Sequence, residues 1–73
     1  PKTTIGYKIP KDAFVTIKVY DAAGRLAATL LNENKKAGAY EVLFNGANFS
    51  SGVYFYVMSA GDFSQAKKLV LLK

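Results

Sequence analysis

The chain has 73 residues, which suits one small domain with a thin core, because a domain of this length buries only about 60% of the surface that its unfolded chain exposes. Apolar residues make up 51% of it, which argues against a disordered tail, and the absence of Cys excludes disulfides and Cys-based zinc or redox sites. Ten Lys and Arg against five Asp and Glu give a net charge of +5, and the absence of His removes the most common general base.

Alternating apolar residues predict β-strands along most of the chain. The predicted strands are residues 3–9, 14–20, 25–31, 39–45, 52–60 and about 64–72. The side chains expected to share one face of their strand, in the first four strands, are Ile5, Tyr7, Ile9, Val15, Ile17, Val19, Leu26, Ala28, Leu30, Tyr40, Val42 and Phe44.

Turn-forming residues separate these strands. In residues 21–24, Asp21 is expected to accept hydrogen bonds from the turn backbone, and Gly24 to adopt a positive φ. Gly46 and Gly52 are expected to be structural residues of a loop, not a phosphate cradle, because no helix follows them. The other predicted connections are residues 32–38, 46–51 and 60–63.

Short strands with turns at intervals of about 8–12 residues predict an all-β fold, a small immunoglobulin-like or fibronectin-like antiparallel sandwich of about six or seven strands. We expect the last strand to close against the opening stretch. A helix over residues 22–31 is the alternative, but Gly24 would lie in its first turn, and a hairpin is the simpler connection. Because the chain opens on Pro1, we expect residues 1–73 to be a single domain of a longer protein.

Aromatic residues are concentrated in the predicted strand 52–60. Tyr54 and Tyr56 flank Phe55, so rings point to both faces, as in a central strand of a thin sandwich. We expect the two tyrosines to be core residues, with a hydroxyl bonded to a nearby carbonyl as at a tyrosine corner. An aromatic platform for a ligand is the alternative.

No arrangement of residues predicts catalysis. An acid/base pair between Glu41 and Asp62 across the sandwich is conceivable, but both positions are expected to be solvated. Ser50 and Ser51 have no base partner in the sequence, and the oxygen-bearing side chains match no calcium loop. We therefore expect that the protein is not an enzyme and has no cofactor and no metal site. The carboxylates, which lie mostly in or beside turns, are Asp12, Asp21, Glu33, Glu41 and Asp62.

The positive charge permits binding to nucleic acid, anionic lipid or anionic glycan. Lysines on a small β domain also protect strand edges and keep the protein soluble. Since no base-stacking motif accompanies them, we expect no nucleic-acid partner. The longest apolar run is far shorter than the about 20 residues of a spanning helix, so we expect no membrane span.

Five blocks of sequence follow one another along the whole chain. They are P-x-T-T-I-x-Y-x-I-P (1–10), V-x-I-x-V-Y-D-A-A-G-R (15–25), A-G-x-Y-x-V-x-F-N-G (37–46), S-S-G-V-Y-F-Y (50–56) and K-K-L-V-L-L-K (67–73). In this order they resemble the type A C-terminal sorting domain of the type IX (Por) secretion system. The immunoglobulin-like module of the flagellar hook-capping protein has similar Val-Tyr-Asp and Gly-x-Tyr patterns, but the lysine-flanked aliphatic end favours the sorting family.

The resemblance implies an immunoglobulin-like module at the C-terminus of secreted or cell-surface proteins of Bacteroidota. It implies as partners an N-terminal cargo domain, the outer-membrane translocon, which reads the module after Sec export into the periplasm, and a sortase-like protease, which removes it. The cargo is then released or anchored to the surface. The second possibility is a non-catalytic structural or accessory module, flagellar-cap-like or polysaccharide-binding, of a larger extracellular protein.

The end of the chain is the predicted recognition element. Its residues are Lys67, Lys68, Leu69, Val70, Leu71, Leu72 and Lys73. Apolar side chains on both faces are typical of a strand buried within a sandwich. If the strand instead lies at a sheet edge, its free N–H and C=O groups could pair with a receptor strand, while the lysines limit uncontrolled pairing.

Overall fold

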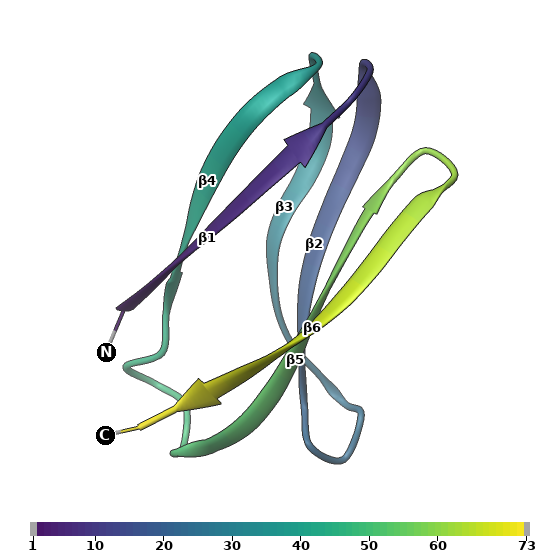
Figure 1. The fold of residues 1–73 in the computed structure, drawn as a ribbon. Coiled ribbons are helices and arrows are strands. Elements are labelled where there is room, and N and C mark those ends of the chain that lie inside the picture. The colour runs from purple at the N-terminus through teal and green to yellow at the C-terminus, as the bar shows by residue number, and fades with distance from the viewer. Residues whose placement is uncertain (1, 73) are drawn as a thin grey trace.

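The structure, a computed structural model, describes residues 2–72, which form six β-strands and no helix (Figure 1). The strands are β1 (Lys2–Ile9), β2 (Ala13–Asp21), β3 (Leu26–Lys35), β4 (Gly38–Asn45), β5 (Gly52–Ala60) and β6 (Phe63–Leu71). All pairings are antiparallel, and the strands form two sheets that pack together. The predicted all-β sandwich is therefore confirmed. Residues 22–31 form the β2–β3 turn and part of β3, as the predicted hairpin requires, and not the alternative helix.

The two sheets differ in size. The larger has the order β3-β2-β5-β6, and the smaller contains only β1 and β4. The sheets approach each other closely where β3 faces β4 and diverge toward β1 and β6 (Figure 1). Within the described residues, β1 and β6 each have one neighbouring strand and one unpaired edge.

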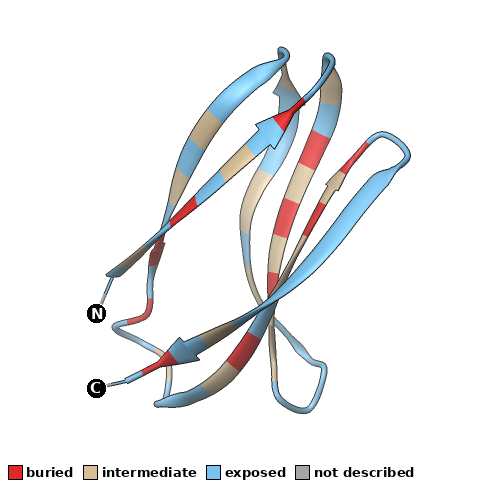
Figure 2. Ribbon diagram, viewed as in Figure 1, coloured by how far each residue is buried: buried red, intermediate tan, exposed pale blue. Residues whose placement is uncertain are grey.

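The core consists of two clusters between the sheets. Buried residues alternate with more exposed ones along β2, as the period of two requires (Figure 2). The cluster nearer the chain ends contains Ile5, Val19, Phe44, Tyr54 and Leu71. The cluster at the opposite end contains Ile9, Val15, Ile17, Met58 and Ala60. Every strand except β3 contributes a buried residue, so the core joins both sheets.

The last strand does not close against the opening stretch, and this prediction was wrong. β6 pairs only with β5, with Leu71 opposite Gly52, whereas β1 pairs with β4. The apolar end is therefore not a strand buried on both faces. The turn at Gly61 and Asp62 is short enough to form a local hairpin, and a hairpin necessarily makes consecutive strands neighbours.

The predicted alternation along β3 is broken by register shifts. Leu26 lies opposite Tyr20 and is 55% exposed, whereas Ala28 lies opposite the buried Val19 and packs against the core. The pairing shifts between Val19 and Tyr20, and the extra residue at such a bulge moves the side chains that follow to the other face. Leu26 and Ala28 thus do not share a face as predicted.

The predicted loop 32–38 is mostly strand, because β3 continues to Lys35 and β4 begins at Gly38. The polar end of β3 pairs by its backbone with the beginning of β2, and an edge strand can carry polar side chains without losing that pairing. The short connection is held by two contacts: Asp12 Oδ1 accepts a hydrogen bond from the Ala37 N–H (2.7 Å), and the Tyr40 hydroxyl donates to the Lys36 carbonyl (2.6 Å).

Candidate recognition surface at the C-terminal strand

The two faces of β6 have different surroundings. Leu71 is 2% exposed and lies in the core, so alternate residues back along the strand, from Leu69 to Phe63, point to the same inner side of the sheet. Leu69 is half-buried and packs against the same cluster as Leu71. The residues between them point to the outer face, which the small sheet does not cover. The C-terminal residues are thus divided between the core and the surface.

The exposed members of the predicted recognition element are accessible to a partner of the folded domain. Lys67 and Lys68 are exposed on opposite faces of β6, and Val70 is 52% exposed on the outer face. Leu72 follows the strand and is 77% exposed. Lys73 lies outside the described residues. A partner that binds the folded chain can therefore contact Val70 and Leu72 directly. Leu71 can affect binding only indirectly, through its packing in the core.

The outer face of the large sheet continues this apolar and basic surface across neighbouring strands. Tyr20 lies opposite Phe55, which lies opposite Lys68, and Val53 lies opposite Val70. We call these five residues the outer strip. Phe55 is exposed, although rings in a small sandwich are normally buried. The exposed apolar members of the outer strip are Phe55 and Val70, and exposed apolar patches on small proteins mark protein-binding surfaces.

Leu71 is fixed by the loop between β4 and β5. A Cβ atom at Gly46 would lie 2.6 Å from Leu71 Cδ1, so the absence of a side chain at Gly46 makes room for this leucine. The side chain of Asn45 accepts a hydrogen bond from the Ala47 N–H (3.0 Å), and Phe49 N–H donates to the Gly46 carbonyl (3.0 Å). The Asn-Gly pair of the fourth predicted strand thus positions the last strand.

An aromatic group closes the same end of the core. Phe49 lies between Phe44 and Tyr54, with ring centroids 5.4 Å and 6.1 Å away. The Tyr54 hydroxyl donates to the Ser50 carbonyl (2.8 Å), which is the tyrosine-corner arrangement. Phe49 packs against this cluster from a loop without a periodic pattern, so periodicity does not predict its contact with the core.

Two other predicted structural residues lie in β5. Gly52 is its first residue, and Tyr56 is half-buried between the two core clusters. β5 is flanked by β2 and β6, so it has the central position that its aromatic residues predict. Its rings divide between the faces: Tyr54 and Tyr56 lie on the inner face and Phe55 on the outer one.

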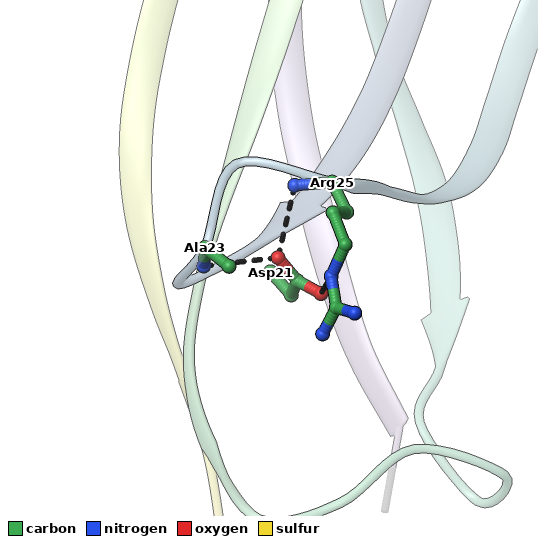
Figure 3. Close-up of polar contacts among 3 residues, drawn as sticks. All are labelled: Asp21, Ala23 and Arg25. Atoms are coloured by element: carbon green, nitrogen blue, oxygen red, sulfur yellow. Dashed lines mark hydrogen bonds and ion pairs between the residues drawn. The ribbon is translucent and has the colours of Figure 1, made fainter.

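The turn between β2 and β3 is organised by one carboxylate (Figure 3). Asp21 Oδ1 accepts hydrogen bonds from the backbone N–H groups of Arg25 (2.9 Å) and Ala23 (3.0 Å), and Oδ2 accepts one from Arg25 Nε (3.0 Å). The backbone bond from Arg25, assisted by the charge of its guanidinium group, lowers the pKa of Asp21 below its ordinary value. Gly24 has a φ of 85°, a conformation that other residues adopt only with strain.

Residues 2–72 contain no group of three or more acidic side chains that could hold a metal ion. Glu41 lines a groove between the sheets, and Asp62 lines a separate hollow at the β5–β6 turn. No described helix is long and apolar enough to cross a membrane. The described residues thus form a small two-sheet sandwich with an exposed apolar surface on its large sheet and a groove between its sheets.

The comparison with protein families makes the assignment specific. The family described as the secretion system C-terminal sorting domain matches residues 2–72, so the chain belongs to this family. Membership gives it the role of a sorting signal in type IX secretion and implies a secreted or cell-surface protein that interacts with the secretion machinery and a cargo. Neither the curated proteins nor the solved structures gave a match.

Proposed function

We propose that residues 1–73 are a non-catalytic C-terminal domain of a longer secreted protein and act as the address of an N-terminal cargo domain. The cargo reaches the periplasm and passes the outer membrane through the type IX translocon. A sortase-like protease then removes the domain, and the cargo is released or anchored at the surface. Family membership supports the sorting role, and the exposure of Val70 and Leu72 beside a free strand edge supports recognition of the folded domain.

The residues of the C-terminal element have different tasks in this proposal. Lys68, Val70 and Leu72 contact the translocon, together with Lys67 and the terminal Lys73. Leu69 and Leu71 act indirectly, because their contacts with the core keep the end of β6 in place. The translocon therefore recognises a strand held on a folded sandwich, and an unfolded tail of the same sequence is a poor substitute.

The test is a fusion of residues 1–73 to the C-terminus of a fluorescent passenger with a Sec signal, produced in a bacterium with a type IX system. Fluorescence at the surface and in the medium is compared with that of a strain that lacks the translocon. Export that requires the translocon supports the proposal. Periplasmic retention of an intact, folded fusion in both strains would favour a structural or accessory module instead.

A matched pair of variants tests the recognition surface. We expect the double substitution Val70→Ser and Leu72→Ser to abolish most export while leaving the fold intact, because both side chains are exposed. The control is Phe14→Ser, which removes an equally exposed side chain (50%) from the opposite end of the same sheet. Normal export of the double variant would exclude a direct role for these residues.

A further inference from the structure

A groove opens between the sheets on the side where they diverge. Its volume is about 780 Å³, and its walls come from β1 and β4 on one side and from β2, β5 and β6 on the other. The apolar side chains that line it include Ile5, Tyr7, Tyr40, Tyr56, Met58 and Phe63. The rings of Tyr7 and Tyr40 stack with their centroids 5.5 Å apart and form a continuous wall.

The groove exists because the small sheet is too narrow to cover the large one. On the opposite side, Leu30 of β3 and Val42 of β4 both pack against the two core clusters and close the sandwich. On the open side, Phe63 is 48% exposed although it lies on the inner face of β6, and Gln65 and Lys67 on the same face are exposed as well. An inner face left open beside two free strand edges has the shape of a sandwich that lacks one strand.

The lining of the groove is basic. Lys8 and Lys67 border it together with one acidic residue, Glu41, and alternation along β1 places the Lys8 side chain on the outer face of the small sheet, beside the free edge. Burial raises the pKa of Tyr7, so its hydroxyl adds no negative charge near neutral pH. A second copy of this chain is poorly suited as an occupant, because each copy carries a net charge of +5. The charge of the groove therefore favours an acidic partner.

We propose that the groove binds an extended, acidic segment of a partner protein, which adds as a β-strand to the free edge of β1. A strand at this edge lies over the open inner face of β6 and converts the small sheet from two strands to three. Its apolar side chains point inward and pack between Tyr7 and Phe63, and its carboxylates, on the opposite face of the strand, lie beside Lys8 on the outer face of β1. Since β1 pairs with β4 over eight residues, the added strand can have a similar length.

This proposal concerns the inner side of the domain and does not depend on the sorting role of the C-terminal element. Each can be tested without the other, because the groove test uses the isolated chain and the sorting test uses export. The free edge of β1 supplies backbone donors and acceptors, and these give affinity without a specific sequence. Specificity comes from the alternation of apolar and acidic side chains.

The probe is a fluorescein-labelled peptide of eight residues in which valine and glutamate alternate, titrated with the 73-residue chain and followed by fluorescence anisotropy. The control peptide has lysine in place of every glutamate. Amide chemical shifts of the ¹⁵N-labelled chain locate the binding site. We expect saturable binding of the acidic peptide and none of the lysine peptide, with the largest amide chemical-shift changes in β1 and β6.

Two charge reversals separate the groove from the overall charge. We expect Lys8→Glu to weaken binding of the acidic peptide about fivefold, the effect of removing a favourable exposed charge pair. Lys18→Glu changes the net charge equally but lies on the outer face of β2, and we expect it to leave binding nearly unchanged. Equal effects of the two substitutions, equal binding of the two peptides, or largest shifts at residues that do not line the groove or the edge of β1 would each overturn the proposal. So would a dimer of the free chain that buries the groove, detected by sedimentation.

Discussion

The buried leucine at the end of β6 offers a direct test of how the last strand is held. Leu71→Ala removes three carbon atoms from a side chain that is 2% exposed and packed against the core. Substitutions of this kind cost about 2–5 kcal/mol. A domain of 73 residues has a free energy of unfolding of about 4–11 kcal/mol, so one methyl-rich side chain at its end accounts for a large share of it.

The assay is thermal unfolding followed by circular dichroism. Since 1 kcal/mol corresponds to about 4–8 °C in a domain of this size, we expect Leu71→Ala to lower the Tm by at least about 8 °C. The neighbouring Leu72 is 77% exposed, and Leu72→Ala is the matched control, with an expected change of less than about 4 °C. A small change for Leu71→Ala, or equal changes for both variants, would refute the assignment of Leu71 to the core and of Leu72 to the surface.

Three further predictions concern the loops. Gly46→Ala places a Cβ 2.6 Å from Leu71 Cδ1 and should cost about 1–3 kcal/mol in urea unfolding; an unchanged midpoint would show that the leucine can move freely. Tyr54→Phe removes a hydrogen bond to the loop backbone and should lower stability by about 1 kcal/mol, measured in the same way, whereas a neutral effect would mean that water replaces the bond. Because Arg25 lowers the pKa of Asp21 in the folded state, the ionised carboxylate stabilises the fold at any pH above its unfolded pKa, and this contribution is lost as the pH falls through the folded-state pKa. The stability of Asp21→Asn should therefore vary less with pH below about 4 than that of the unsubstituted chain. Identical pH profiles of the two proteins would contradict this.

Periodicity predicted the strands because most of them have one buried and one solvated face. In β1, Ile5 and Ile9 are buried and Tyr7 is half-buried, as a period of two requires. The turn at Asp21 was also predictable, since its side chain and Gly24 act within the turn itself. Local chemistry of this kind is present in the sequence without knowledge of the fold.

Periodicity does not predict which strands pair with each other or which strands lie at a sheet edge. Four consecutive aliphatic residues at 69–72 are compatible with a strand buried on both faces as well as with an edge strand. Only the topology shows that β6 is an edge strand whose Val70 is exposed. The polar end of β3 gave no apolar alternation, because an edge strand needs only backbone pairing there. Likewise, the sequence alone does not show that Leu71 points into the core, and this orientation decides which residues of the C-terminal element are buried and which are exposed.

The edge position of β6 has a consequence for the dynamics of the domain. The strand has one neighbour, its residues from Phe63 to Lys68 are all exposed, and its buried contacts are concentrated at Leu71. Segments with few buried contacts open locally at a lower free energy than the whole domain. We therefore expect the first two thirds of β6 to exchange amide hydrogens through partial fraying, while the last residues exchange only when the core opens. The C-terminal end of β6, around Leu71, is then the most firmly held part of this strand, so it keeps one position while the first part of β6 fluctuates.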